Sequence, residues 1–361
     1  MDSSDSWTGT FPDDVIMNIL ARLPVKSMFR FKCVCKAWHK LTSDPYFIKF
    51  HNEMPSASSG VLVEIVQSVS NQSNFVCIDS SSHMAEFSLD FLSDRVKIRA
   101  SCNGLLCCAS IPNRGVYYIC NPATRQWRIL PRTRTRPVTR YHPDDEANLV
   151  GLAFDPKFKK FNVVLAGFYR PFGRRALDCL VCQIFDSETN LWRRSIVTQN
   201  DVFTHMNRNQ VVFARRSLHW LTYSTSHILV LNLDKEIWMR IPLPNVLVGA
   251  YNCRVYLLEL EGAVSLVQIT EGFMSIWVLD DCVGENWVEL ERVNLRCIKG
   301  FIPSIFPISQ SRDLIFLATQ RHIFVYHLKS MVWKEVYSVK NSVAYPLWFS
   351  SYAHRSTLYS W

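Results

Sequence analysis

Five tryptophans recur along the chain at spacings that constrain its fold more than any other feature. The separations are 65, 46, 49 and 46 residues, between Trp127, Trp192, Trp238, Trp287 and Trp333. The last three separations match the length of one blade of a β-propeller, which is about 40–50 residues. The first separation leaves room for an inserted loop. The spacing therefore predicts a body built from repeated β units.

The residues before each tryptophan share a common pattern. Ten and eight residues before it the side chain is apolar in every unit, and six residues before it stands Asn or Asp in four of the five units. Alternating apolar positions are typical of a strand with one buried face, and Asn or Asp opens turns by bonding to its own backbone. Each unit is therefore predicted to be a strand, a tight turn and a second strand entered at the tryptophan. The indole is expected to lie flat between neighbouring units, which covers its apolar area.

Short apolar runs precede these hairpins and are candidate inner strands. They lie at 104–109, 149–154 with 163–166, 217–222, 255–259 and 313–318, and residues 61–91 form a sixth unit without the tryptophan. One hairpin cannot bury its own apolar face, whereas several in a radial array can, and closing the circle leaves few exposed edges. Residues 61–361 are therefore predicted to be a six-bladed, partly irregular β-propeller-like domain. A pair of β-sandwiches is the structural alternative.

The segment 11–51 differs from the rest because its signals are helical. Pro12 favours a helix start, and the Asp13 carboxylate is placed to cap the first turn. Pro24 ends this helix. The apolar residues between them fall on one helical face, which comprises Val15, Ile16, Ile19, Leu20 and Leu23.

Three shorter helices are predicted to follow. Ser27 can cap the second helix, the third runs from 35 to 41, and the fourth covers 46–51. Residues 52–60 are rich in Ser, Pro and Gly and are the predicted linker, while residues 1–8 are predicted to be flexible. About 40 residues rarely make an independently stable core. The helical cluster therefore needs a partner, which is either the β domain, on which it would form a cap, or another protein.

Four short motifs follow one another in the helical segment. They are Phe11-Pro12-Asp13-Asp14, Ile19-Leu20-Ala21-Arg22-Leu23-Pro24, Val25-Lys26-Ser27-Met28 and Phe31-Lys32-Cys33-Val34-Cys35-Lys36-Ala37-Trp38. In this order they resemble an F-box, with predicted bounds of 9–51, the module that docks a protein onto the Skp adaptor of a Skp–cullin–F-box ubiquitin ligase. Compared with the family pattern, Phe11 and Met28 replace Leu, and Asn18 stands where an acid is usual.

Further stretches of the β region share a family pattern, namely 101–106, 121–127 with 130–131, 151–156, 218–221 and 228–244. They resemble the plant F-box-associated interaction domain. The chain has no Gly-Gly pair, so it is not a regular kelch array. The Asn-Gly usual before the Leu-His-Trp strand is replaced by Arg216-Ser217, which leaves the type of that turn open.

The two resemblances imply a non-catalytic, substrate-recognition subunit of the ligase. Its helices would bind the adaptor, its β domain would bind a target protein, and a cullin–RING scaffold would be joined indirectly. No cofactor is implied. The residues expected to contact the adaptor are Phe11, Pro12, Val15, Ile16, Ile19, Leu20, Leu23, Pro24, Phe31, Val34, Cys35 and Trp38. Two alternatives remain: an F-box protein that sequesters or localises a partner outside the ligase, and a propeller that binds glycans or nucleic acid.

The charge and the cysteines of the chain bear on nucleic-acid binding, metal binding and cellular location. The net charge of +9 comes largely from clustered arginines, which we expect to be solvated, without nucleic-acid binding, because no nucleic-acid module accompanies them. The 12 cysteines are expected to be small buried hydrophobes, and the Cys179–Cys182 pair lacks a partner pair for zinc. No signal peptide, membrane span or catalytic motif is found. The protein is expected in the cytoplasm, the nucleus or both.

Overall fold

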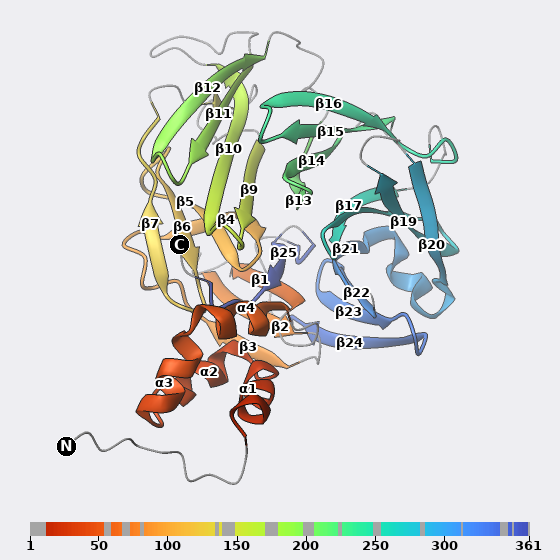
Figure 1. Ribbon diagram of the computed structural model, residues 1–361. Helices are drawn as coiled ribbons and strands as arrows, with labels where there is room; N and C mark the ends of the chain where they lie inside the picture. The colour runs from red at the N-terminus through yellow and green to blue at the C-terminus, as the bar shows by residue number, and fades with distance from the viewer. Residues whose placement is uncertain are drawn as a thin grey trace, which may run out of the picture.

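The β domain is a closed ring of six sheets, each forming one blade (Figure 1). This computed structural model describes residues 12–53, 59–66, 73–79, 83–133, 137–138, 149–169, 180–197, 206–222, 226–247, 254–281, 286–311, 313–339, 346–348 and 350–359. All pairings between neighbouring strands in the sheets are antiparallel, as expected for strands joined by short turns. The predicted six-bladed fold is confirmed, and the β-sandwich alternative is wrong.

Five blades follow one another along the chain. Blade 1 contains β4 (Val96–Cys102), β5 (Leu105–Ser110), β6 (Tyr117–Asn121) and β7 (Gln126–Ile129). Blade 2 contains β8 (Pro137–Val138), β9 (Leu149–Asp155), β10 (Lys160–Tyr169), β11 (Leu180–Asp186) and β12 (Leu191–Val197). Blade 3 contains β13 (Met206–Ala214), β14 (Ser217–Thr222), β15 (His227–Asn232) and β16 (Ile237–Pro242).

The next two blades keep the same four-stranded order. Blade 4 contains β17 (Arg254–Leu260), β18 (Ala263–Ile269), β19 (Phe273–Asp281) and β20 (Asn286–Asn294). A 3₁₀ segment, η2 (Arg296–Ser304), leads into blade 5, which contains β21 (Phe306–Gln310), β22 (Leu314–Ala318), β23 (His322–His327) and β24 (Val332–Ser338).

Blade 6 is assembled from both ends of the β domain. Its strand order is β25 (Ser351–Arg355), β1 (Ser59–Val66), β2 (Ser73–Asp79) and β3 (Met84–Phe87). β25 is antiparallel to β1, with Ser59 opposite Arg355 and Val63 opposite Ser351. The innermost strands β4, β9, β13, β17, β21 and β25 each contact the next, and β25 contacts β4. The last strand of the chain therefore closes the ring, which the sequence pattern did not predict.

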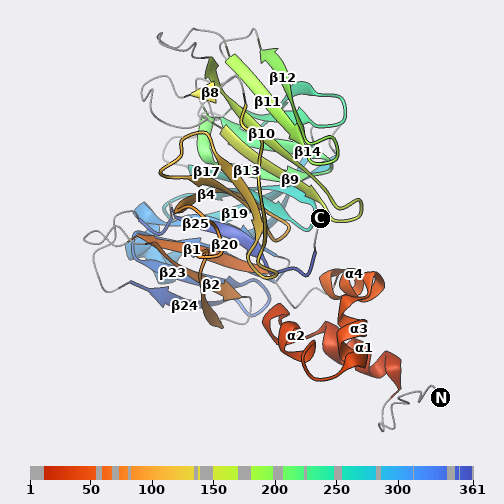
Figure 2. The same ribbon diagram turned by 90° about the vertical axis from the view of Figure 1, so that its left-hand side faces the viewer.

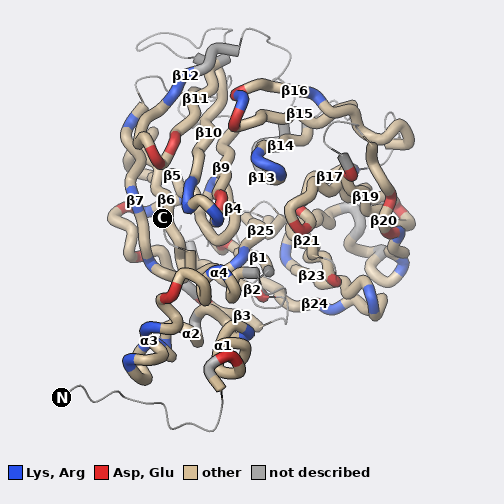
Figure 3. The backbone as a smooth tube through the Cα atoms, viewed as in Figure 1, with Lys and Arg blue, Asp and Glu red and all other residues tan. Residues whose placement is uncertain are grey.

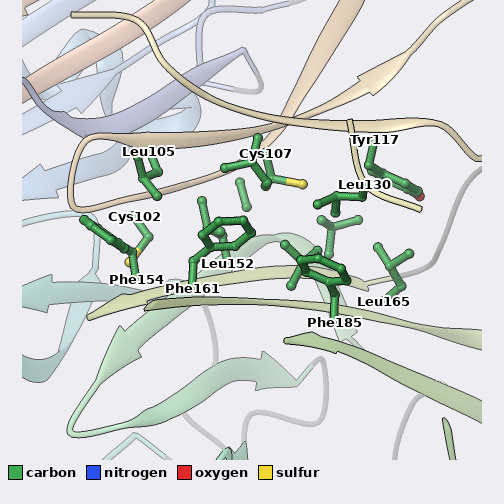
Figure 4. Packing of buried hydrophobic residues seen from close by; sticks show 14 of the residues in the cluster. Cys102, Leu105, Cys107, Tyr117, Leu130, Leu152, Phe154, Phe161, Leu165 and Phe185 are labelled. Carbon is green, nitrogen blue, oxygen red and sulfur yellow. The ribbon is translucent and has the colours of Figure 1, made fainter. Parts of the chain in front are cut away.

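The hydrophobic core lies between adjacent blades. Figure 4 shows Leu105, Cys107 and Tyr117 of blade 1 facing Phe161 and Phe185 of blade 2. Similar clusters join blade 2 to blade 3, blade 3 to blade 4, blade 4 to blade 5, and blade 5 to blade 6. Each blade is thus held by its neighbours, as in other radial repeats.

The five repeated tryptophans lie on the outermost strands β7, β12, β16, β20 and β24. Trp192, Trp238, Trp287 and Trp333 are partly buried and pack against the core clusters between blades. Trp127 differs from the prediction, because 41% of it is exposed, although its ring still lies near Tyr118. Two residues before the tryptophan the backbone is left-handed in four described turns, namely at Arg125, Asn190, Glu236 and Met331.

Four helices precede the β domain and lie together beside the ring (Figures 1 and 2). They are α1 (Asp13–Ala21), α2 (Val25–Phe31), α3 (Lys36–Ser43) and α4 (Pro45–Glu53). The predicted caps Asp13 and Ser27 are wrong, because both residues lie inside helices whose N-caps are Pro12 and Pro24. Asp44 caps α4, since its Oδ1 accepts bonds from the backbone N–H groups of Tyr46 and Phe47 at 2.8 and 3.2 Å.

Candidate adaptor-binding surface

The helices form a small unit with its own buried centre. α4 contacts both α1 and α3, and α3 contacts α2. The imidazole Nε2 of buried His51 lies 2.9 Å from the Leu23 carbonyl oxygen, which ties the turn between α1 and α2 to α4. Phe31 and Trp38 pack edge to face with ring centroids 5.0 Å apart. These contacts fix the relative positions of the helices and thereby the side chains on their outer surface.

The predicted adaptor-contact residues divide into an inner and an outer group. Leu20 is only 2% exposed and belongs to the core of the helical unit, so its side chain is not on the exposed face. Four more are partly buried against that core, namely Ile16, Leu23, Phe31 and Trp38. On a helix, successive residues point in different directions, so residues of one apolar stripe can differ in burial.

The outer group forms the candidate adaptor-binding surface. Val15 and Ile19 are four residues apart on α1, hence on one side of it, and Ile19 is 52% exposed. Val34, in the turn between α2 and α3, is 61% exposed. Pro12, Pro24 and Cys35 are exposed as well. Phe11 lies outside the described residues. Because contiguous exposed apolar side chains mark protein-binding sites, this outer group is the candidate for such a patch.

Another part of the helical unit is already covered by the β domain. Its core cluster includes Leu358 and Ala123, from the end of the chain and from the β6–β7 turn. The β domain therefore covers part of the helical segment. The outer group remains uncovered and is available to another protein. Sequence reasoning missed both contacts, because Leu358 lies in no recognised motif and Ala123 lies in the 121–127 stretch, which was recognised only as part of the β domain.

An ion-pair network lies in the turns of blades 2 and 3. The Arg216 guanidinium donates to both carboxylate oxygens of Asp234, with contacts of 2.7–3.0 Å, and to Asp155 at 2.9 Å. This pairing lowers the pKa of Asp234 and raises that of Arg216. Arg193 adds a contact of 3.0 Å to Glu236. Basic and acidic residues are interspersed over the β domain (Figure 3).

The structure shows the type of the turn between β13 and β14, which the sequence left open. Arg215 and Arg216 have φ values of 46° and 59°, so they are the two left-handed residues between β13 and β14. Two positive φ values are typical of a type I′ hairpin turn, which Asn-Gly usually makes. The Arg pair, and not Arg216-Ser217, therefore occupies the Asn-Gly position. The clustered arginines 134, 136, 140, 174 and 175 lie outside the described residues.

The cysteines and histidines show no arrangement for metal chemistry within the described residues, where no group of three potential ligands is found. Cys102 and Cys182 are buried as predicted, and burial raises the pKa of each thiol to about 12. Cys33, Cys35 and Cys297 are exposed, contrary to the prediction for cysteines as a whole. Cys179 is not among the described residues. Over the described chain, no helix has the length and apolar content to cross a membrane.

Comparison with known families agrees with this architecture. An F-box domain model matches residues 10–50, and an F-box associated beta propeller domain model matches residues 57–337. The two matches coincide with the helical unit and with most of the ring. The chain therefore belongs to the F-box proteins that carry an F-box associated β-propeller, and F-box proteins are typically non-catalytic adaptors.

The relatives are plant proteins. The chain is 49% identical over 352 residues to "F-box protein At5g49610" of Arabidopsis thaliana, covering 96% of this chain and 97% of that protein. It is 26% identical over 335 residues to "F-box/kelch-repeat protein At3g61590" of the same plant, covering 86% and 79%. Among solved structures, "YCF48 from Cyanidioschyzon merolae" matches with 10% identity and a TM-score of 0.41, covering 84% of this chain and 94% of that one.

Proposed function

We propose that this protein is a substrate-recognition subunit of a Skp–cullin–F-box ubiquitin ligase. The observation that carries the proposal is the outer group of apolar residues, which stays exposed although other residues of the same helices are packed on the β domain. A Skp-type adaptor would cover this surface, and a cullin–RING scaffold would join through the adaptor. The β-propeller would hold a target protein, so that its lysines are concentrated near the charged conjugating enzyme.

Adaptor binding is tested by introducing charge into the outer group. Ile19→Asp should weaken binding of a purified plant Skp-type adaptor by at least about 100-fold, because a carboxylate would be buried unpaired in the interface. Isothermal titration calorimetry with the full chain measures the affinity. Val332→Asp on β24 is the matched control, since Val332 is 53% exposed and Ile19 is 52% exposed. Unchanged affinity for the Ile19 variant would contradict the assigned surface.

Binding of cullin distinguishes a subunit of the ligase from a protein that only sequesters or localises a partner. If the proposal holds, cullin co-purifies with the adaptor and the wild-type chain, and both are lost together in the Ile19→Asp variant. Recovery of the adaptor without cullin would favour the alternative in which the protein only localises a partner. A fluorescent fusion would show whether the protein lies in cytoplasm or nucleus, as a subunit of this ligase should.

Nucleic-acid or glycan binding is the alternative from a different class. The pairing of Arg216 with Asp234 and Asp155, and of Arg193 with Glu236, speaks against free phosphate-binding arginines at these positions. Nucleic-acid binding would weaken steeply as salt rises. Titration with single-stranded RNA at two salt concentrations, and retention on a glycan resin, would reveal it.

A further inference from the structure

The chain continues beyond the last strand into a position between the helical unit and blade 1. β25 ends at Arg355, and residues 356–359 follow it without regular secondary structure. The matched propeller model ends at 337, so neither β25 nor this continuation lies within the matched family region. We call residues 355–359 the C-terminal clasp, because their two sides contact different parts of the molecule.

One side of the clasp contacts the helical unit. Leu358 is buried in the same cluster as Leu20, Met28 and Phe47. The Leu358 backbone N–H donates to Asn52 Oδ1 at 3.4 Å, and the Arg355 guanidinium donates to the Asn52 carbonyl oxygen. The helices are therefore joined to the clasp by an apolar contact and by two hydrogen bonds that converge at the end of α4.

The other side of the clasp contacts blade 1 and blade 2. The buried Asn121 side chain donates from Nδ2 to the carbonyl oxygens of Thr357 at 3.1 Å and Tyr359 at 2.9 Å. The Tyr359 ring packs edge to face on Phe154, with centroids 5.7 Å apart. Gly104, with φ of +86°, lies so close that a Cβ there would be 2.3 Å from Thr357 Oγ1. Blade 1 is thus shaped to receive this segment.

We infer that the C-terminal clasp fixes the orientation of the F-box helices relative to the β-propeller. Domains joined only by a short linker move relative to one another unless a specific interface holds them. The clasp supplies that interface with directional bonds on both sides. Its consequence for ubiquitin delivery rests on the proposed function: the clasp sets the distance and direction from the adaptor surface to the target-binding domain.

The test severs each side of the clasp separately in the full-length chain. Leu358→Ala removes the apolar contact with the helices, whereas Asn121→Ala removes the bonds from blade 1 to the Thr357 and Tyr359 carbonyls. Leu358→Met is the matched control, because it keeps an apolar side chain of similar volume. Each variant is examined in complex with a plant Skp-type adaptor, by small-angle X-ray scattering and by hydrogen exchange of α4.

Both alanine variants should show a larger radius of gyration and faster exchange at α4, while Leu358→Met behaves as wild type. Adaptor affinity should change by less than about twofold, since the outer group is untouched. Scattering and exchange equal to wild type in both alanine variants would overturn the inference. Failure of the wild-type chain to bind the adaptor would instead overturn the proposed function, and the same measurements on the free chain would still test the clasp.

Discussion

At the scale of single residues, four of the five repeated tryptophans act as contacts between blades. The Trp192 indole N–H donates to the Pro131 carbonyl oxygen at 2.6 Å, and Trp287 donates to Pro242 at 2.9 Å. Each of these prolines stands four residues after the tryptophan of the preceding blade. The indole therefore adds a directional bond between blades to the apolar area it covers, which explains why a tryptophan suits this position better than phenylalanine.

The contribution of a tryptophan should depend on its burial. Trp238 packs on Trp220, with ring centroids 5.5 Å apart, within the cluster between blades 2 and 3. Trp238→Ala should lower the free energy of unfolding by about 3 kcal/mol, because the cavity it leaves cannot collapse fully. Trp127→Ala should cost at most about 1 kcal/mol, since Trp127 is mostly outside the core clusters. Urea denaturation of both variants measures the difference, and equal losses would contradict the assignment of Trp238 as a contact between blades.

Two buried histidines should make stability depend on pH. Burial lowers the pKa of His219 and of His354 from 6.5 to about 4. The unfolded chain therefore takes up protons at these sites first as the pH falls. Their contribution to stability is complete above pH 6.5, is lost as the pH falls toward 4, and changes no further below that value.

The histidine prediction is checked by urea denaturation at two pH values. The loss for each histidine between pH 7 and pH 5 should be on the order of 2 kcal/mol. His354→Gln removes one titrating group while keeping a polar side chain, so its loss over this range should be smaller than that of the wild type by about the same amount. A wild type and a variant with parallel pH profiles would show that His354 does not titrate differently in the folded state.

At the scale of elements, the sequence predicted what repeats and missed what closes the ring. The hairpin before each tryptophan was found because apolar alternation and an Asn or Asp recur in a fixed register, as at Asn121, whose Oδ1 accepts from the Ala123 N–H at 2.9 Å. β25 carries no such register, because its partner β1 lies almost 300 residues away in sequence and pairing at that distance leaves no local pattern.

In the candidate adaptor-binding surface too, local patterns were predicted and features set by tertiary packing were missed. The apolar face of α1 was visible in the sequence, but the pattern could not separate Leu20, which is buried, from Ile19, which is exposed. That distinction depends on how α1 meets α4 and Leu358, and tertiary packing of this kind has no signature within one helix. The helix starts were misplaced for a related reason: Pro12 and Pro24 precede their helices directly, leaving Asp13 and Ser27 inside them.

At the scale of the whole molecule, the end of the chain performs two separable tasks. β25 supplies the inner strand of blade 6 and contacts β4 and β21 on either side, so it completes the ring. The residues after it join the ring to the F-box helices. Closing a propeller with strands from both ends of the domain removes an open edge, and it also brings the chain terminus beside the N-terminal helices (Figure 2).

Two truncations should therefore have different effects on the ring. A chain ending at Ser350 lacks β25, leaves the inner edge of β1 unpaired and opens the ring between β21 and β4, so we expect loss of cooperative thermal unfolding and aggregation on size-exclusion chromatography. A chain ending at Arg355 keeps β25 and lacks only the rest of the C-terminal clasp, so it should remain monomeric with a cooperative β-sheet transition followed by circular dichroism. If the shorter chain unfolded as cooperatively as the longer one, β25 would not be the strand on which closure depends.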